Sequence, residues 1–380
     1  MEVHTLGFTQ KKRWSTNNRP KIDSRRTLIL LFGPSSFLDS DGPLDELLHD
    51  YPESVVMGCS TAGEILGTQI FDDSLSVAIM RFDHTELRMA NATVGSAEEA
   101  FAAGQMIAQQ LNGAGLKGIF VLSDGLHVNG SELVRGLNSQ VPPSVVVTGG
   151  LAGDGDRFRR TWVVQDRKPK PGFVTAVGFY GDHIRIGHGS KGGWDRFGPE
   201  RRVTKSKGNV LFELDGRPAL QLYKEYLGDR AAGLPATGLL FPLALRADQG
   251  EAKSLVRTIL AVDEREQSLT FAGDIPEGAL AQLMKANFDR LVQGASEAAT
   301  TTKLAGDGCS STLAVAISCV GRRLVLGERT EEETEATLDV LPPGTQQVGF
   351  YSYGEISPYA TGTCDLHNQT MTLTTFREAA

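Results

Sequence analysis

The sequence predicts a mixed α/β fold in which sheets with flanking helices form two related lobes that face a shared ligand cleft. Two observations carry this prediction. Strand-like and helix-like segments alternate along most of the chain, with hairpins between them, as is typical of mixed α/β proteins. A strand that ends in Gly-Glu occurs once in each half of the chain, at Gly63-Glu64 and at Gly354-Glu355. This repetition indicates two related lobes.

The first part of the chain is typical of a βαβ unit. Residues 27–32 are continuously apolar, which predicts a strand buried on both faces. Asp41-Gly-Pro opens a helix, because Asp caps helices and Pro favours the first turn. Residues 54–59 form the next strand, and a helix between two successive strands makes those strands parallel.

Further elements follow from alternation and from capping boxes. Ser96 with Glu99, and Asn129 with Glu132, predict two helix starts. The remaining strands of the first half are predicted at residues 74–82, 86–94, 118–122, 144–148, 173–180, 184–189 and 209–214.

In the second half, Asp274 with Glu277 predicts the start of the longest helix. Its expected buried stripe is Leu280, Leu283, Met284, Phe288, Leu291 and Val292, which recur at intervals of three and four. Thr330 with Glu333 predicts another helix. The strands of this half are predicted at residues 255–262, 268–272, 313–319, 323–326, 346–353 and 370–375.

Length and composition predict three segments. A chain of 380 residues exceeds most single hydrophobic cores, so two domains are expected. We expect a disordered basic tail over residues 1–26, an N-terminal domain over 27–215 and a C-terminal domain over 216–380.

Charge and cysteine usage favour a cytoplasmic protein without nucleic-acid or membrane partners. The formal net charge is -8, which argues against nucleic acid as the main ligand. No apolar run is long enough to span a membrane, and the N-terminus lacks the apolar core of a signal peptide. The four cysteines lack a CxxC pair, so we expect reduced thiols rather than a zinc site or disulfides.

The candidate ligand-binding residues are polar residues and glycines at predicted strand ends, where side chains converge on a cavity. They are Ser60, Thr61, Gly63, Glu64, Gly150, Asp154, Arg322, Tyr353, Glu355, His367 and Asn368. The glycine-rich loop 149–155 would bind an anion through backbone N–H groups, or is a plain connection. Arg322 would bind a ligand carboxylate, or lies in a surface turn.

Two chemical alternatives stay open. In the first alternative, Ser60 or Cys59 is a nucleophile, His367 is its base, and Asp365 or Glu64 orients the histidine. In the other reading, Ser60 only makes hydrogen bonds at a strand end. The histidines show no HxxxH or HxH pattern, which disfavours a multi-histidine metal site. A single axial haem ligand needs no such pattern, and His367, His188 and Cys319 are the candidates.

Six segments, in order from Thr27 to Phe376, resemble the FIST sensory family. They are Gly58-Cys-Ser-Thr-Ala-Gly-Glu64, Gly149-Gly-Leu-Ala-Gly-Asp154, the stretch from Val203 to Gly216 with Pro218-Ala219, Ser318-Cys-Val-Gly-Arg322, Tyr351-Ser-Tyr-Gly-Glu-Ile356 and His367-Asn-Gln-Thr370. The resemblance implies a FIST N part followed by a FIST C part.

The resemblance also implies a function. It suggests an intracellular input module for a small ligand such as an amino acid. NosP-type members are similar and bind haem to sense nitric oxide beside histidine kinases or cyclic-di-GMP enzymes. Since no output segment is visible in this chain, we expect a sensor without catalytic residues that regulates a separate partner. The alternatives are a hydrolase or acyl-transfer enzyme that uses Ser60 or Cys59 with His367, and a scaffold protein.

Overall fold

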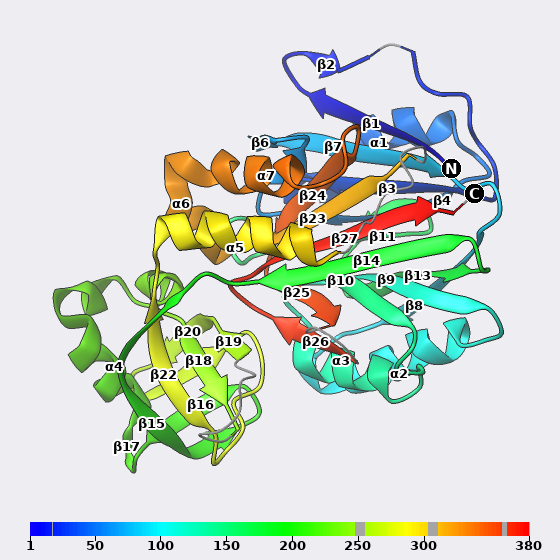
Figure 1. The fold of residues 1–380 in the computed structure, drawn as a ribbon. Helices are drawn as coiled ribbons and strands as arrows, with labels where there is room; N and C mark the ends of the chain where they lie inside the picture. The colour runs from blue at the N-terminus through cyan, green and yellow to red at the C-terminus, as the bar shows by residue number, and fades with distance from the viewer. Residues whose placement is uncertain (17, 248–254, 303–310, 359–362, 380) are drawn as a thin grey trace.

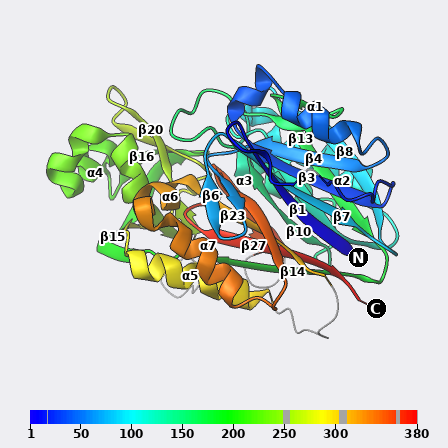
Figure 2. The same cartoon turned by 90° about the horizontal axis from the view of Figure 1, so that it is seen from above.

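The computed structural model describes residues 1–16, 18–247, 255–302, 311–358 and 363–379. Three sheets form a core, and a fourth sheet forms a small domain to one side of it (Figure 1). The view from above also places the small domain, which contains α4 (Ala219–Leu227), beside the core rather than over it (Figure 2). The predicted mixed α/β class is confirmed.

The core consists of three related units. Each unit has an outer strand, two parallel strands joined through a helix, a hairpin and a return strand. The first unit contains β1 (Glu2–Thr9), β3 (Thr27–Gly33), α1 (Gly42–His49), β4 (Val55–Ser60), β5 (Glu64–Leu66), β6 (Gln69–Phe71) and β7 (Ser74–Arg81).

The second and third units repeat this order. The second contains β8 (Glu86–Thr93), α2 (Ala100–Leu111), β9 (Leu116–Ser123), α3 (Gly130–Asn138), β10 (Val146–Leu151), β11 (Val163–Gln165), β12 (Lys168–Lys170) and β13 (Phe173–Tyr180). The third contains β14 (Ile184–Lys191), α5 (Phe288–Thr301), β23 (Leu313–Cys319), α6 (Val320–Leu326), α7 (Thr330–Asp339), β24 (Gln346–Ser352), β25 (Gly354–Pro358), β26 (Cys364–His367) and β27 (Met371–Glu378).

Each unit gives its hairpin to the sheet of a neighbour. β11 of the second unit pairs with β4 of the first, β25 of the third with β10 of the second, and β5 of the first with β24 of the third. Three backbone hydrogen bonds follow the same cycle. Ala62 N–H donates to Tyr351 O at 2.8 Å, Gly153 N–H to Ser60 O at 2.9 Å, and Tyr353 N–H to Leu151 O at 3.3 Å. The three units therefore close a ring.

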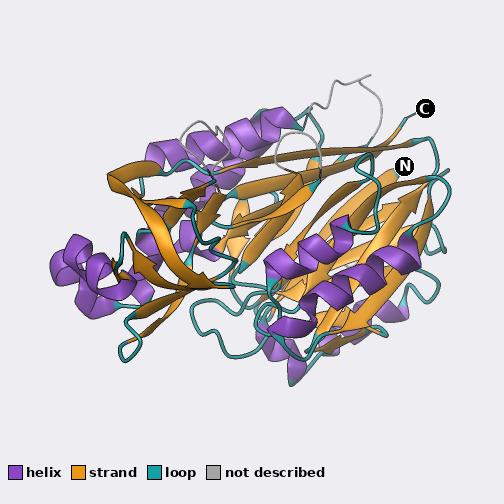
Figure 3. Ribbon diagram, turned by 90° about the horizontal axis from the view of Figure 1, so that it is seen from below, coloured by secondary structure: helices purple, strands orange, loops and turns teal. Residues whose placement is uncertain are grey.

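Buried aromatic residues fill the space between the sheets. One hydrophobic cluster contains Phe32 of β3, Phe120 of β9 and Phe350 of β24. The rings of Phe32 and Phe350 stack with centroids 4.8 Å apart. On the outside, α2 and α3 lie side by side against the second sheet (Figure 3). The ends of β4 and β24, which this packing positions, carry three of the predicted site residues, Ser60, Thr61 and Tyr353.

The small domain is inserted into the third unit, between β14 and α5. It has its own apolar cluster, in which Leu211, Tyr223 and Phe271 are buried. Its strands are β15 (Asp195–Lys207), β16 (Val210–Leu214), β17 (Arg217–Pro218), β18 (Leu243–Arg246), β19 (Leu255–Arg257), β20 (Ile259–Asp263), β21 (Ser268–Phe271) and β22 (Leu280–Lys285). Because β15 pairs with β22 from Asp195 and Lys285 onward, the chain enters and leaves the insertion at neighbouring points.

Short elements complete the described chain. They are β2 (Arg13–Trp14) and the 3₁₀ helices Ser35–Leu38, Ala97–Glu99, Gly228–Gly233, Ala236–Leu240 and Gly327–Arg329. No helix in the described residues combines the length and apolar character needed to cross a bilayer.

The prediction of a disordered tail over residues 1–26 is corrected by the structure, because this segment contains two strands. Residues 2–9 form β1, which pairs along its whole length with β7, and residues 13–14 form β2. Val3, Leu6 and Phe8 are buried in this strand, and their burial stabilises it. The tail was predicted from the basic residues that follow, and these lie outside β1.

Two elements of the second half were predicted wrongly. The expected helix from residue 274 is a turn followed by β22, and α5 begins only at Phe288. Leu280, Leu283 and Met284 are buried because β22 lies between β15 and β18, so their spacing came from a buried strand. The expected strand at 323–326 belongs to α6, which buries Val320 and Leu326.

Candidate ligand-binding site

Glu64 anchors the first hairpin from a fully buried position at the start of β5. Its carboxylate accepts hydrogen bonds from Thr61 Oγ1 at 2.5 Å, from Ser74 N–H at 3.0 Å and from Ser74 Oγ at 2.9 Å. Burial raises the pKa of Glu64 to about 7, although these hydrogen bonds oppose the shift. The carboxyl group is held by its own hairpin rather than presented to a cavity.

Glu355 repeats this arrangement in the third unit. It accepts hydrogen bonds from Ser352 Oγ at 2.6 Å, Thr370 Oγ1 at 2.9 Å and Thr370 N–H at 3.3 Å. Burial raises the pKa of Glu355 to about 8, against the hydrogen bonds from Ser352 and Thr370 and the charge of Arg322. The two Gly-Glu turns are thus equivalent, and they belong to two of the three units.

Asp154 organises the loop that follows β10. It accepts hydrogen bonds from Ser35 Oγ, from Arg157 Nε at 2.9 Å and from Arg157 Nη2 at 2.7 Å. The backbone N–H groups of Arg159 and Arg160 donate to its second oxygen. Burial alone would raise the pKa of Asp154, but the hydrogen bonds from Arg157 and Ser35 outweigh it and lower the pKa.

Arg322 lies neither in a surface turn nor beside a cavity, which corrects both expectations for it. Its side chain is fully buried in an ion pair with Glu333, with Nε and Nη2 at 3.0 and 2.7 Å from Oε2. Nη1 donates to Gly192 O at 2.6 Å and Nη2 also donates to Leu291 O at 2.8 Å. This arginine joins α6, α7 and the start of the small domain.

The other predicted residues also hold the centre of the ring together. Tyr353 Oη donates to Gly155 O at 3.0 Å, and its ring stacks on Phe158 with centroids 4.4 Å apart. Asn368 Nδ2 donates to Tyr353 O at 3.5 Å, and Gly150 pairs with Glu355 in the sheet. Three more positions are equally enclosed: Gly63, against which the Arg323 guanidinium packs, Ser60 and Thr61.

The nucleophile arrangement is not assembled within the described chain. Ser60 is fully buried and its Oγ accepts a hydrogen bond from Trp162 N–H at 3.0 Å. His367 Nε2 lies 2.9 Å from Ser357 O inside the β25–β26 hairpin. No hydrogen bond between described residues joins His367 to Ser60 or Cys59, and burial raises the pKa of the Cys59 thiol. These contacts support the role of Ser60 as a hydrogen-bonding strand-end residue.

The described residues do not fit a haem site. His367 and Cys319 are buried, and His188 is half-buried in β14. Burial and the nearby Glu355 raise the pKa of the Cys319 thiol well above its usual value. Within the described ranges no histidine, cysteine, methionine or tyrosine lines any of the three cavities of about 540, 520 and 680 Å³, and no cluster of three or more metal-binding side chains occurs.

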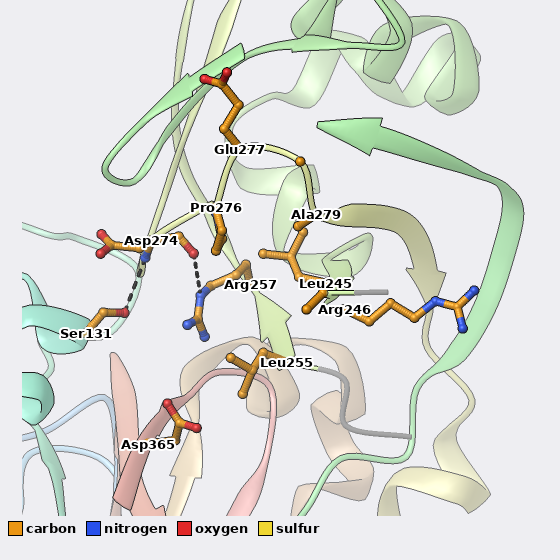
Figure 4. A pocket seen from close by; sticks show the side chains of 12 residues that line it. Ser131, Leu245, Arg246, Leu255, Arg257, Asp274, Pro276, Glu277, Ala279 and Asp365 are labelled. Carbon is orange, nitrogen blue, oxygen red and sulfur yellow. Dashed lines mark hydrogen bonds between the residues drawn. The ribbon is translucent and has the colours of Figure 1, made fainter. Parts of the chain in front are cut away.

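A cavity of about 540 Å³ lies between the small domain and the core (Figure 4). The core contributes Ser131 from α3 and Asp365 from β26, whereas the small domain supplies the remaining walls. None of the residues predicted to bind a ligand lines it. The small-domain residues are Leu245, Arg246, Ala247, Leu255, Arg257, Asp274, Pro276, Glu277, Gly278 and Ala279.

Arg257 is the chemically distinctive residue of this cavity. It is only 4% exposed, and its Nε donates to Asp274 O at 3.1 Å. Its Nη1 donates to Leu366 O at 3.0 Å and Val256 O at 3.3 Å. Within the described part of the chain, Nη2 has no hydrogen-bond partner and the guanidinium has no ion pair. Burial lowers the pKa of Arg257, against the nearby charges of Asp365 and Asp274.

A buried guanidinium without a direct ion pair is costly, and the nearby charges of Asp365 and Asp274 offset only part of that cost. Arg246, on the same cavity wall, is different because it pairs with Glu200 through Nε and Nη2 at 2.6 and 2.5 Å. Figure 4 shows the Arg257 guanidinium directed toward the side on which Asp365 lies.

Family models match nearly the whole core and the small domain. The FIST N domain model matches residues 27–217, and the FIST C domain model matches residues 219–358. The chain belongs to the FIST family. FIST domains are associated with sensory signal transduction and small-ligand binding. The boundary between the two models falls inside the small domain of this FIST protein, at Pro218, the last residue of β17.

Other comparisons add little to this assignment. No curated protein matches this FIST protein. Among solved structures, it is similar to cyanuric acid hydrolase from A. caulinodans, with 9% sequence identity, a TM-score of 0.30, and coverage of 91% of this chain and 89% of that chain. This likeness is too distant to support any conclusion about activity.

A second cavity of this FIST protein, of about 520 Å³, is lined by residues of all three units. Its two arginines already have protein partners. Arg323 binds Asp72 through two contacts of 2.8 Å and Ala62 O at 2.6 Å, and Arg157 is held by Asp154. The first cavity is therefore the better ligand site.

Sequence reasoning missed Arg257. The signal was an arginine inside an otherwise strand-like apolar run, Leu255-Val-Arg-Thr-Ile-Leu260. A charged residue within such a run needs either a partner or a function.

Proposed function

We propose that this FIST protein is a sensory input protein that binds a small metabolite of the amino-acid type in the cavity between the small domain and the core. The ligand carboxylate binds Arg257, and the bound protein regulates a separate output partner such as a histidine kinase or a cyclic-di-GMP enzyme. The observation that carries the proposal is the buried Arg257, which lines a cavity of about 540 Å³ and has no direct ion pair among the described residues.

The cavity has the chemical features that a small zwitterion requires. Arginine recognises carboxylates through paired N–H donors. Leu245, Leu255 and Pro276 supply apolar walls for a side chain. Asp274, Glu277 and Asp365 lie on the same lining, and their carboxylates would be the acceptors for an ammonium group. A mostly apolar cavity with a few convergent polar groups is the usual form of a small-ligand site.

Haem is not part of this proposal, because the described lining of the cavity offers no axial ligand. A hydrolase is not proposed either, because Ser60 lacks a histidine partner among the described residues.

The test is a binding screen with amino acids and with their amides, measured by thermal shift and then by isothermal titration calorimetry. We expect the acids to bind and the amides, which lack the carboxylate charge, to bind weakly. Replacing Arg257 by Gln should weaken binding about 10- to 100-fold, because charge-assisted hydrogen bonds contribute roughly 1.5–3 kcal/mol. Arg257→Lys keeps the positive charge but loses the paired N–H donors of the guanidinium. Its affinity should therefore lie between those of the wild type and Arg257→Gln.

Arg265→Gln is the matched control, because Arg265 is an exposed arginine of the same domain outside the cavity. Circular dichroism would show that each variant is folded. Equal binding of acids and amides, or unchanged affinity in folded Arg257→Gln, would refute the carboxylate site.

A further inference from the structure

The small domain has its own hydrophobic core and joins the rest of the protein through a smaller apolar cluster that contains Trp194, Ala244, Met284, Leu291 and Leu326. The hydrophobic core is formed by residues from Val203 to Leu283. The chain joins it to the core at two neighbouring points, where Asp195 and Lys285 pair. Such a domain can move as a unit when its interface is small or polar.

The attachment is anchored on the core side. Trp194 Nε1 donates to Gln369 O at 2.8 Å, and Asn287 caps α5 while its Nδ2 donates to Asp195 Oδ2 at 3.3 Å. Just before Trp194, Gly193 has a φ of +119°, a conformation that favours glycine. Gly193 therefore marks the place where the backbone leaves the core, close against Arg290 and Leu291 of α5.

On the far side of the cavity, the domain is held to the core by a few polar contacts. Asn129 Nδ2 donates to Asp274 Oδ1 at 2.9 Å, and Asp274 N–H donates to Ser131 Oγ at 3.3 Å. Arg257 Nη1 donates to Leu366 O at 3.0 Å. Each such hydrogen bond contributes only about 1 kcal/mol net, because water replaces it when the contact opens.

The closed interface also leaves a buried polar group unpaired. Gln369 Nε2 donates to Leu239 O of the small domain at 3.2 Å, but Gln369 Oε1 is buried with no partner among the described residues. A buried acceptor without a hydrogen bond is costly, and opening would allow water to reach it. The contact of Gln369 with the small domain therefore includes one buried acceptor without a hydrogen bond among the described residues.

We propose that the small domain opens and closes about the attachment at Gly193–Asp195 and Lys285–Asn287, and that an occupied cavity closes it. The ligand-driven part of this inference rests on the proposed function. Ten lining residues of the cavity belong to the small domain and two to the core, so a ligand that touches both binds the closed state more tightly. The position of the small domain is then the signal that an output partner reads.

Arg257 links ligand and closure. Its Nη1 donates to Leu366 O of the core hairpin, and the same side chain lines the cavity. A carboxylate on Nη2 would hold the guanidinium in the orientation that reaches the hairpin.

The first test is a disulfide lock between Ser131→Cys and Gly273→Cys. A Cβ at residue 273 would lie 2.8 Å from Ser131 Oγ, so the two positions meet only when the domain is closed. We expect the oxidised lock to have a smaller radius of gyration by small-angle X-ray scattering than its reduced form. Amide exchange in β19 should slow by roughly tenfold or more on oxidation. Identical scattering and identical exchange in the two forms would overturn the proposal.

Asp274→Ala is the second variant, because it removes the hydrogen bond from Asn129 and forms no new one. It should increase the radius of gyration and speed up exchange in β19. Asp263→Ala is its control, since Asp263 accepts hydrogen bonds only from its own turn, at Arg265 and Glu266. An Asp274→Ala protein as compact and as protected as the wild type would also overturn the proposal.

The ligand arm uses an equimolar mixture of the common amino acids as the probe. It should compact the wild type and leave the oxidised lock unchanged. If the lock and Asp274→Ala behave as expected but the mixture has no effect on the wild type, the domain movement is supported and the amino-acid ligand of the proposed function is refuted.

Discussion

Glu64 and Glu355 show how a single residue type can serve the same purpose twice. Each follows a glycine at the start of a hairpin, and each accepts a hydrogen bond from a hydroxyl three residues earlier. In the second unit, the corresponding hairpin position is occupied by Val163, which is buried opposite Cys59. The two carboxyl groups therefore fix hairpins in two of the three units, and apolar packing fixes the third.

These carboxyl groups predict a pH dependence of stability. The unfolded chain releases their protons near the ordinary pKa of 4.5, whereas the folded protein keeps them to about 7 at Glu64 and about 8 at Glu355. The folded protein binds more protons in this window, so the free energy of unfolding falls as the pH rises from about 5 to about 8. Glu378 does not contribute there, since the pKa of Glu378 is lowered to about 2.

Because glutamine cannot ionise, Glu355→Gln should reduce the decrease in the free energy of unfolding between about pH 5 and pH 8 by on the order of a few kcal/mol. The measurement is urea unfolding of wild type and variant across the same pH range. Glu266→Gln, on the exposed surface of the small domain, should keep the wild-type slope. If Glu355→Gln loses stability with pH as steeply as the wild type, the buried carboxyl of Glu355 is not the cause.

At this scale the sequence located the two Gly-Glu turns, and the structure adds the hydrogen-bond partners that hold their carboxylates. Glu64, Asp154 and Glu355 do lie in or beside the ends of strands, as their positions after apolar runs predicted. Whether a buried polar group faces a cavity or its own hairpin depends on partners such as Ser74 and Thr370. Ser74 lies ten residues beyond Glu64 and Thr370 fifteen beyond Glu355, and no local pattern specifies either pairing.

Among the secondary-structure elements, the parallel strand pairs are held unusually close by glycine. A Cβ at Gly58, Gly149 or Gly349 would lie 2.5, 1.8 or 1.8 Å from the carbonyl oxygen of Leu31, Val121 or Ala316. In each unit the second parallel strand thus carries a glycine that faces the backbone of the first. No side chain fits there without separating the strands.

Gly349→Ala should therefore destabilise the protein by about 3 kcal/mol or more, because it forces β23 and β24 apart. Urea unfolding with a fluorescence readout would measure the change. Gly42→Ala is the control, since a Cβ at Gly42 would meet nothing within 4 Å and the residue lies in α1. A Gly349→Ala protein with wild-type stability would show that the strands adjust more easily than this geometry implies.

The same scale explains which elements could be predicted. The apolar strand at 27–32 and the Asn129 helix cap depend on local sequence, and the structure contains both. The region from residue 274 could not be assigned correctly, because a strand that is buried on both faces and a buried helical stripe place apolar residues at overlapping positions. Only the pairing of β22 with β15 and β18 shows that this region is a strand.

At the scale of the whole molecule, the ring and the insertion have separate roles. The ring is closed by hairpins that cross from unit to unit, and the insertion supplies most of the cavity. The sequence revealed two Gly-Glu halves but not the ring, since strands that pair across units are far apart along the chain, as β5 and β24 are.

Removing the insertion tests this separation. A chain in which residues 196–284 are replaced by a short Gly-Ser linker should fold, because Asp195 and Lys285 are paired neighbours. It should unfold in one cooperative transition and bind no amino acid by calorimetry. The full-length protein with Arg257→Gln serves as a folded, non-binding comparison. An unfolded or aggregated chain would show that the ring depends on the small domain.

The exchange of hairpins also has a consequence for how the chain is made. The hairpin at residues 64–71 leaves the ribosome early, yet the strand that it pairs with begins only at Gln346. During synthesis the β5 edge stays unpaired until almost the whole protein has emerged. Exposed strand edges of this kind promote association between chains. We therefore expect nascent forms of this protein to need protection until the last unit arrives and closes the ring.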